Sequence, residues 1–359
     1  MSQIGWLKYV TRMVAATWLL GLTGTAVGQS GVTVSWVTAA QRNDNSKLVD
    51  IYYNLSASGP CTVWPVVSGD GGATWNVPAQ TYTGDFGANI PPGSGRHIVW
   101  DAGADIPGKV GSFRTRVFAD DGSALTNMVL VPGGTFPYQN NTSAQIFVPT
   151  FLIDKYEVTN QRYAEFLNDA DPNGQYWTAQ QEITRNVAGQ SVFYAPWPGK
   201  QEYPVRYVSA LDAEAFAAWL STREGRNFRL PTDQEWEKAA GWDPLTNTLW
   251  FYGFINNNNS IDCTWANYSQ CVGVTREVGY YNGQNGTGHA RSPYGGYDMS
   301  GNVFEWTGTL FSGGPAHTFR GGHYLLQESY CRTTTIANQA FWPGDRTLYV
   351  GFRLVQDAQ

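Results

Sequence analysis

The chain between residues 29 and 126 alternates apolar and polar positions with the period of a β-strand. Each predicted strand places its apolar side chains on one face: Val32, Val34 and Trp36 in VTVSW; Val49, Ile51, Tyr53 and Leu55 in LVDIYYNLS; and Phe113, Thr115 and Val117 in SFRTRVF. Turns rich in Gly, Pro, Asn and Asp separate these short runs. The pattern therefore predicts an all-β sandwich over residues 29–126.

From Met128 the pattern changes to strands mixed with helices. MVLVPGGTF combines an apolar run with a Gly-Gly turn and predicts a strand, whereas AEAFAAWLSTREG carries apolar residues at helical spacing. The helix signals are Ser209, Asp212 and Gly225 around the stripe Ala213, Phe216, Ala217 and Leu220, and Thr232 with Glu235 before WEKAA. After Gly241 few helix signals remain. We expect an α+β domain over residues 127–359.

Length and composition agree with two turn-rich domains. The 359 residues exceed a typical domain of roughly 100–200 residues. They include 40 Gly, 18 Pro and 15 Trp, but only 14% of them are charged, as in β-rich and loop-rich proteins. The net charge of −6 and the lack of a Lys/Arg cluster in the sequence argue against a nucleic-acid partner.

The N-terminus has the pattern of a secretory signal peptide. Lys8 and Arg12 precede the apolar run MVAATWLLGLTGTAV, and the small residues Ala26 and Gly28 stand where cleavage before Gln29 requires them. The alternative, a retained membrane anchor, is disfavoured because the run is shorter than the ~20 residues that span a bilayer. We expect residues 1–28 to be removed and the mature protein to be secreted or periplasmic, without a transmembrane segment.

Export would place the four cysteines in an oxidising compartment, where disulfides persist. Cys61, Cys263, Cys271 and Cys331 allow three pairings, which the sequence alone does not separate. Because Cys263 and Cys271 lie in one loop, DCTWANYSQC, we expect a local disulfide between them. Cys61 and Cys331 would then stay unpaired in different domains.

Seven segments of the second half, taken together and in this order, resemble the formylglycine-generating enzyme family, also called sulfatase-modifying factors. They are MVLVPGGTF (128–136), FLIDKYEVTNQRYAEFLND (151–169), YPVRYVSALDAEAFAAWL (203–220), RLPTDQEWEKAA (229–240), YGGYDMSGNVFEWT (294–307), FRGGHY (319–324) and GFRLV (351–355). The resemblance implies a compact domain of the C-type-lectin-like fold, low in regular structure. The preceding sandwich resembles immunoglobulin-like or fibronectin-like domains in its coarse strand pattern.

For chemistry, the resemblance implies oxidation by O₂ of a cysteine in a sulfatase peptide to Cα-formylglycine, with one copper ion held by two thiolates. Soft Cu(I) favours such sulfur ligands. The two family positions correspond here to Leu326 and Cys331, so one thiolate is missing. His323, which replaces the family's serine after the two glycines, is a candidate substitute ligand, although a lone histidine on a packed loop is more often structural. Cys331 and His323 are thus the candidate catalytic residues.

The resemblance also implies structural calcium, which oxygen-rich loops favour. The candidate ligands are the side chains of Asn302 and Glu305 with the carbonyl oxygens of Gly301 and Val303 in GNVFEW, and, in a second family site, Asn267 and Tyr268 in WANYS. The alternative for GNVFEW is a turn in which Glu305 pairs with an arginine such as Arg320.

No other catalytic motif competes in this sequence, since G-x-S-x-G, H-E-x-x-H and phosphate-loop patterns are absent. Helix capping explains Asp233, Glu235 and Glu237. Three functions stay open: an oxidase with an altered copper site acting on a sulfatase-type peptide, an exported binding module for a glycan or a protein, and a structural protein of the cell envelope. Because Leu326 removes one copper ligand, the residues favour the binding module.

Overall fold

The computed structural model describes residues 32–72, 77–109, 111–120, 128–244, 246–256, 259–311, 314–336 and 341–357, and the predicted signal peptide at residues 1–28 lies outside them. The described chain forms two compact units. Unit 1 covers residues 32–72 and 79–120, and unit 2 covers residues 77–78 and the residues from 128 onward. In the described part of the chain, no helix is both long and apolar enough to cross a membrane.

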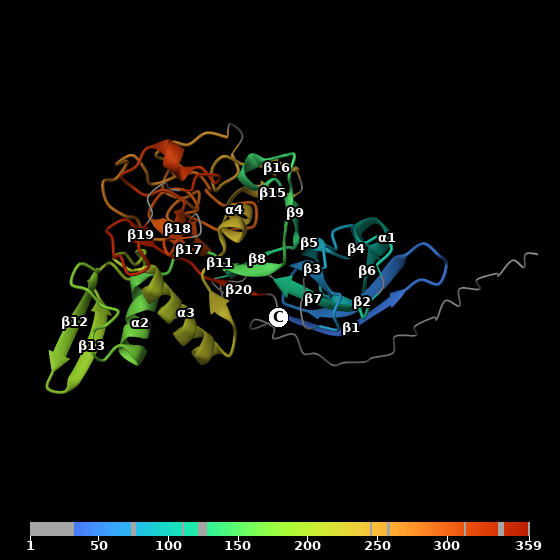
Figure 1. The fold of residues 1–359 in the computed structure, drawn as a ribbon, viewed down its shortest axis with the longest axis horizontal. Helices are drawn as coiled ribbons and strands as arrows, with labels where there is room; N and C mark the ends of the chain where they lie inside the picture. Colours follow the sequence, from blue (N-terminus) through green and yellow to red (C-terminus); the bar gives the residue numbers. More distant parts are fainter. Residues whose placement is uncertain are drawn as a thin grey trace, which may run out of the picture. The chain divides into compact units, whose positions relative to one another are not determined.

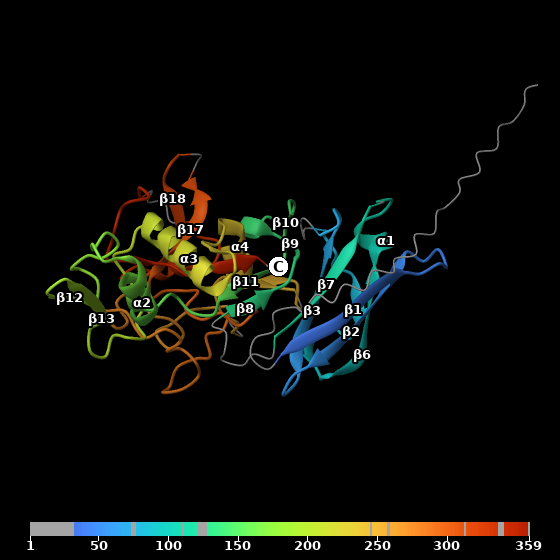
Figure 2. The same ribbon diagram turned by 90° about the horizontal axis from the view of Figure 1, so that it is seen from below.

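Unit 1 is built from two antiparallel sheets. Its elements are β1 (Thr33–Gln41), β2 (Leu48–Ser56), β3 (Cys61–Ser68), β4 (Tyr82–Gly84), β5 (Gly87–Ile90), β6 (Gly93–Asp101), the short helix α1 (Ala102–Asp105) and β7 (Arg114–Asp120). One sheet has the strand order β1-β2-β6-β4 and the other has the order β5-β3-β7. Figure 2 labels β1, β2 and β6 of the first sheet and β3 and β7 of the second. The predicted inward positions Ile51, Tyr53 and Leu55 of β2 are buried, so the strand pattern is confirmed there. The immunoglobulin-like or fibronectin-like assignment stays a prediction.

Trp36 breaks the predicted pattern. Val32 and Val34 are buried, but Trp36 is 78% exposed. The pairing of β1 with β2 is irregular between Ser35 and Thr38, and Trp36 within this bulge has a φ of 56°. A bulge adds one residue to the strand and re-aims a side chain, whereas a left-handed backbone costs a non-glycine residue roughly 1–2 kcal/mol. The prediction that Trp36 joins the core face was wrong for this reason.

Unit 2 mixes short strands with a few helices (Figure 1). Its strands are β8 (Met128–Val131), β9 (Gly134–Phe136), β10 (Ile146–Val148), β11 (Phe151–Asp154), β12 (Ile183–Ala188), β13 (Ser191–Pro196), β14 (Phe228–Arg229), β15 (Trp242–Asp243), β16 (Thr248–Leu249), β17 (Phe304–Leu310), β18 (His317–Arg320), β19 (Val350–Gly351) and β20 (Val355–Asp357). The helices are α2 (Asn160–Ala170), α3 (Ala210–Glu224) and α4 (Asp233–Gly241), with 3-10 turns η1 (Tyr138–Asn140) and η3 (Glu328–Cys331). The predicted α+β class is confirmed.

Two sheets organise unit 2. The first has the strand order β14-β20-β11-β8, and the second has the order β18-β17-β19. In the first sheet, Phe151 of β11 pairs with Val131 of β8 on one side and with Asp357 of β20 on the other. The beginning and the end of unit 2 therefore meet on β11. The remaining strand pairs, β9 with β10, β12 with β13 and β15 with β16, are antiparallel.

The helix starts follow the predicted capping signals. Ser209 and Asp212 exchange side-chain and backbone hydrogen bonds at the start of α3, and Gly225 ends that helix with a φ of 65°. Thr232 and Glu235 form the same box at the start of α4. The predicted stripe of α3 is buried in the core: Ala213, Phe216, Ala217 and Leu220. The first turns of α4 are thereby fixed beside β17 and β18, which carry the candidate site.

Candidate functional site

The double-glycine turn after β18 packs directly on the candidate cysteine. Gly321 and Gly322 have φ values of 94° and 77°, which only glycine adopts readily. A Cβ atom on Gly322 would lie 2.7 Å from the Sγ atom of Cys331. The fold therefore packs the double-glycine turn directly against Cys331.

Cys331 is a buried neutral thiol. It is fully buried in an apolar cluster with Tyr252, Phe254 and Tyr281, and it forms no disulfide. Burial, together with the nearby Glu328 carboxylate, raises the pKa of the Cys331 thiol to about 12. Because thiolate is the form that binds metal and attacks substrates, the thiol as placed here is inert at neutral pH.

Leu326, which the family resemblance matches to the first copper thiolate, packs in a different cluster from Cys331. It lies against the main core cluster of unit 2, with Tyr330 and Tyr349, whereas Cys331 belongs to a different cluster. The described residues also gather no group of three His, Cys, Asp or Glu side chains suited to a metal ion. The side chains present do not fit a copper ion held by two thiolates.

His323 is a packed structural histidine in this arrangement. It is buried, its ring stacks on Tyr349 with centroids 4.4 Å apart, and it meets Phe304 edge-on at 5.0 Å. Its Nδ1 atom accepts a hydrogen bond from the Leu325 backbone N–H at 3.2 Å. Burial lowers the pKa of His323 to about 4, so the imidazole is neutral at physiological pH. These contacts support the structural interpretation of His323 over ligation.

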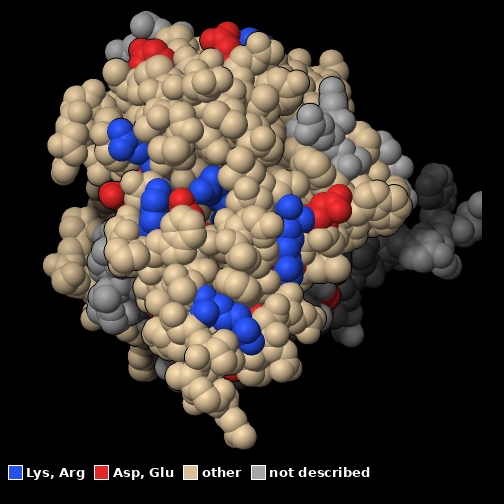
Figure 3. Space-filling model, turned by 90° about the vertical axis from the view of Figure 1, so that its left-hand side faces the viewer, with Lys and Arg blue, Asp and Glu red and all other residues tan. Residues whose placement is uncertain are grey.

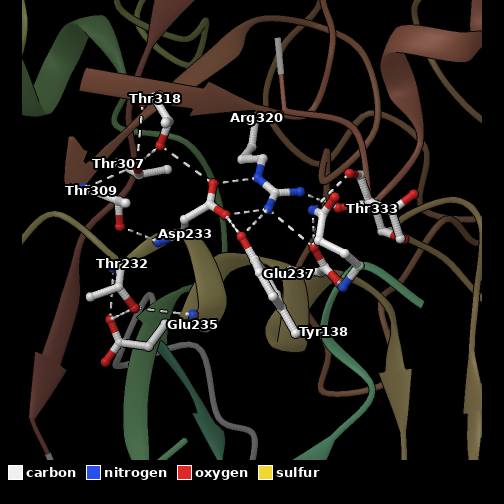
Figure 4. Close-up of polar contacts among 12 residues, drawn as sticks. Tyr138, Thr232, Asp233, Glu235, Glu237, Thr307, Thr309, Thr318, Arg320 and Thr333 are labelled. Carbon is white, nitrogen blue, oxygen red and sulfur yellow. Dashed lines mark hydrogen bonds and ion pairs between the residues drawn. The ribbon is translucent and has the colours of Figure 1, made fainter. Parts of the chain in front are cut away.

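A buried network of charged side chains holds Arg320, the residue just before the double-glycine turn (Figure 4). Arg320 forms a bidentate ion pair with Asp233, and its NH2 group also lies 3.1 Å from a Glu237 oxygen. The Tyr138 hydroxyl donates to Asp233, and the Arg320 NH1 group donates to the Thr333 carbonyl oxygen at 2.8 Å. The network therefore ties β18, α4, η1 and the segment after Cys331 together.

Glu237 is the titratable member of this network. It is fully buried and accepts hydrogen bonds from the Gln139 backbone N–H at 2.5 Å and from the Gln139 side chain at 2.9 Å. Burial raises the pKa of Glu237 to about 7, although Arg320 favours its charged form. Capping accounts for Glu235, but it does not account for Asp233 and Glu237, which point to Arg320. Their i, i+4 spacing on α4 was the sequence signal for this role.

Glu305, a predicted calcium ligand, is instead occupied by protein donors. Arg353 holds both of its oxygens, at 2.6 and 2.7 Å, and the Trp236 indole N–H donates at 2.8 Å. The predicted alternative, an ion pair of Glu305 with an arginine, is right in kind. The partner suggested for Glu305, Arg320, was wrong, because Arg320 pairs with Asp233 of α4.

The interior around Arg353 carries an excess of acid. Glu157, Asp298 and Glu305 interact there with this one arginine. Burial and the neighbouring carboxylates raise the pKa of Glu157, and burial raises the pKa of Asp298 to about 6. Three buried acids facing one cation would favour either bound protons or a further cation.

The two predicted calcium segments lie together. Gly301 packs on the Asn267 backbone, and the Asn302 N–H donates to the Asn267 carbonyl oxygen at 2.8 Å. The Asn302 side-chain oxygen is taken by the Arg276 N–H at 2.9 Å. The Asn267 Oδ1 atom, in contrast, is buried without a hydrogen-bond partner in the described structure. Asn267 is therefore the predicted side-chain ligand that fits a cation best as placed, and calcium stays a prediction.

The neighbouring loop is closed by a disulfide between Cys263 and Cys271. Within it, the Tyr268 hydroxyl donates to the Ile261 carbonyl oxygen at 3.2 Å. Two backbone bonds, from Ser269 to Leu326 at 2.8 Å and from Gln270 to Tyr324 at 2.7 Å, join the loop to the turn after β18. At Val303, whose carbonyl oxygen is a predicted calcium ligand, the backbone N–H donates to Glu157 at 3.4 Å.

The sequence of this chain is similar to one protein family and to several of its known members. Residues 114–358 match the family described as sulfatase-modifying factor enzyme 1-like domain. Formylglycine-generating enzyme of Thermomonospora curvata is 29% identical over 294 residues, which cover 64% of this chain and 93% of that protein. Hercynine oxygenase of Mycolicibacterium smegmatis is 30% identical, over 53% of this chain and 47% of that protein. Inactive C-alpha-formylglycine-generating enzyme 2 of Bos taurus is 28% identical, over 52% of this chain and 71% of that protein.

Proposed function

Because this chain belongs to the sulfatase-modifying factor enzyme 1-like domain family, we propose that unit 2 is a non-catalytic member that acts as an exported binding module for a glycan or a protein. One observation carries the proposal: Leu326 packs in one apolar cluster while the Cys331 thiol is buried in another. Two thiolates cannot meet on one copper ion with these residues.

The relatives support separating the scaffold from any single reaction. Three similar proteins are named as a formylglycine-generating enzyme, a hercynine oxygenase and an inactive C-alpha-formylglycine-generating enzyme. Family membership thus fixes the domain but not its chemistry, because function resides in the site residues that a fold carries. In this chain those residues are buried and packed.

The charge pattern supports a glycan or protein partner over a nucleic acid. The protein has a net charge of −6. On the face drawn in Figure 3, Lys and Arg side chains lie in separate patches, and several of them adjoin Asp or Glu. A nucleic-acid site would need a continuous basic surface. Export rests on the residue pattern of the first 28 positions.

The competing function is a copper-dependent oxidase that converts a cysteine of a sulfatase-type peptide to Cα-formylglycine. It retains one argument, since Cys331 is present and lies under the double-glycine turn. The test is to incubate the full chain with copper, air and a peptide containing C-x-P-x-R, and to look for the aldehyde product by mass. We expect no turnover. Turnover that disappears in Cys331→Ser would overturn the proposal and make His323 the first suspect as substitute ligand.

A second arm restores the missing ligand. Leu326→Cys supplies the absent thiol, and Leu326→Ala is the control for the change in packing. Copper binding that appears in Leu326→Cys alone would support an eroded oxidase site kept as a binding surface. Binding in neither variant would mean that the site has been rebuilt at more positions, and the binding module would stand without an oxidase history.

We also propose that calcium stabilises unit 2 near Asn267. The support is the unpartnered Asn267 oxygen and the surplus of buried acid linked to it through Asn302, which bonds both Asn267 and Glu157. Calcium favours carboxylate, amide and carbonyl oxygens in such loops. Direct metal analysis of the purified protein would test this independently of any activity.

A further inference from the structure

We propose that the outer face of the sheet β1-β2-β6 in unit 1 binds a neutral polysaccharide, with Trp36, Tyr52 and His97 as the contact surface. This inference goes beyond the function proposed for unit 2 and does not depend on it. Each step below rests on unit 1 alone.

Tyr52 and His97 form a paired aromatic surface. They are direct partners in the register of β2 and β6. Their rings stack with centroids 4.4 Å apart and planes 9° apart. Tyr52 is 45% exposed, and the His97 side chain is 36% exposed. The outer face of this sheet therefore offers two parallel rings to solvent instead of the small polar side chains usual there.

The ion pair of Arg42 with Asp50 and a polar contact from Asp50 to His97 hold this stack in place. The Arg42 guanidinium donates to both oxygens of Asp50, at 2.8 and 2.7 Å, and the His97 Nε2 atom lies 2.8 Å from an Asp50 oxygen. The hydrogen bond from Arg42 lowers the pKa of Asp50 to about 2, so this carboxylate stays charged over the physiological range. A surface fixed before binding loses little side-chain freedom when a ligand arrives.

Trp36 adds a further exposed aromatic side chain to this sheet, at a structural cost. It lies in the β1 bulge with a left-handed backbone, and its side chain is 78% exposed. A strained backbone that exposes a large aromatic ring gains nothing from packing within the fold. Strain of this kind tends to persist where it serves a site, and bulges often re-aim side chains next to binding sites.

The strand register places Thr38 of β1 beside the aromatic pair. Thr38 of β1 pairs with Tyr52 from the side opposite His97, so the free face of the Tyr52 ring looks toward β1. Trp36 lies two residues before Thr38 on the same strand, inside the bulge, and its side chain is exposed. The strand next to Tyr52 therefore carries a further exposed aromatic side chain.

The chemistry of these exposed side chains fits a sugar ring. A pyranose presents an apolar C–H face that packs on the electron-rich face of an aromatic ring. Its hydroxyl groups can bond to hydroxyl and carboxylate groups such as those of Thr38 and Asp50. A nucleic acid would require cations that track a backbone, but the nearby Arg42 is already neutralised by Asp50. A neutral polysaccharide chain is therefore the favoured ligand.

The test uses the full chain and three soluble β-1,4-linked hexasaccharides, of glucose, of xylose and of N-acetylglucosamine, in calorimetric titrations. We expect at least one of them to bind saturably. Trp36→Ala should weaken that binding at least tenfold, and Trp342→Ala, which removes a tryptophan that is 65% exposed in unit 2, should leave it unchanged.

Trp36→Gly supplies a readout that a merely structural role would not give. Glycine adopts a φ near 56° without strain, so this variant should melt at a higher temperature than the wild type while it loses the sugar. Binding to none of the three hexasaccharides would overturn the proposal, as would sugar binding that Trp342→Ala weakens and Trp36→Ala leaves intact. Self-association lost in Trp36→Ala, without sugar binding, would reassign the surface to a second copy of the chain.

Discussion

Glu237→Gln should make the stability of unit 2 less dependent on pH. The folded-state pKa of Glu237 is about 7, raised by burial from its ordinary value of 4.5. A group whose pKa rises on folding holds its proton more tightly in the folded state. Its contribution is therefore complete below about pH 4.5 and is lost as the pH rises through about 7.

The expected size of this effect follows from the shift. A difference of about 2.5 pKa units corresponds to about 3 kcal/mol of unfolding free energy, at about 1.4 kcal/mol per unit. Glutamine has nearly the same shape but cannot ionise, so the variant should not lose this amount between pH 4.5 and 7. The substitution also disturbs the hydrogen bonds from Gln139 to Glu237, and this lowers the unfolding free energy by an amount that does not change with pH.

The assay is denaturant unfolding of the full chain at several pH values, with a spectroscopic probe that reports on unit 2. The informative quantity is the unfolding free energy of the wild type minus that of Glu237→Gln, since other titrating groups cancel in it. This difference should fall by about 3 kcal/mol between pH 4.5 and 8. Glu165→Gln, which removes an exposed carboxylate of α2, is the matched control. A difference that stays constant across this range would refute the reasoning.

Three further predictions concern the scaffold. Gly322→Ala should lower the unfolding free energy by about 2–4 kcal/mol, because the new Cβ meets the Cys331 Sγ atom and the φ is positive. The control Gly273→Ala, where a Cβ meets no atom within 4 Å, should lower it by about 1 kcal/mol. Equal losses of unfolding free energy in the two variants would contradict this prediction. Replacing Cys263 and Cys271 by serine together should cost roughly 2–3 kcal/mol, and an unchanged melting temperature would argue against the loop constraint. A calcium chelator should lower the melting temperature, and full recovery with calcium but not magnesium is the expected control.

Local signals in the sequence predicted the elements that depend on near neighbours. The capping pairs of α3 and α4 lie within one turn of each helix, so spacing alone located both starts. The alternation in β2 likewise identified Ile51, Tyr53 and Leu55 as core residues. The family motifs identified the domain, because seven segments in one order constrain each other.

Contacts between residues far apart in the chain could not be predicted from the sequence. Arg353 rather than Arg320 pairs with Glu305, since the strand register of β17 with β18 and β19 decides which arginine enters that part of the core. Trp36 left the core face because a bulge inserted one residue, and no turn residue announces that bulge. The side chains that bury Cys331 could not be identified from the sequence, because they are scattered along the chain.

The meeting of β8 and β20 on β11 also has a consequence for how the molecule is made. Hydrogen bonds at the end of β11 join residues 200 positions apart, for example from the Asp154 backbone N–H to the Leu354 carbonyl oxygen and from the Leu354 N–H to the Asp154 carboxylate. Such distant contacts carry a large loop-closure entropy and slow folding. A nascent chain that has emerged only as far as β19 still lacks β20, one of the two inner strands of that sheet, so its apolar surface stays uncovered. The first sheet of unit 2 can therefore be completed only after β20 has been synthesised. Until then the partly folded chain exposes apolar surface, so protection from aggregation by a chaperone is needed up to that point.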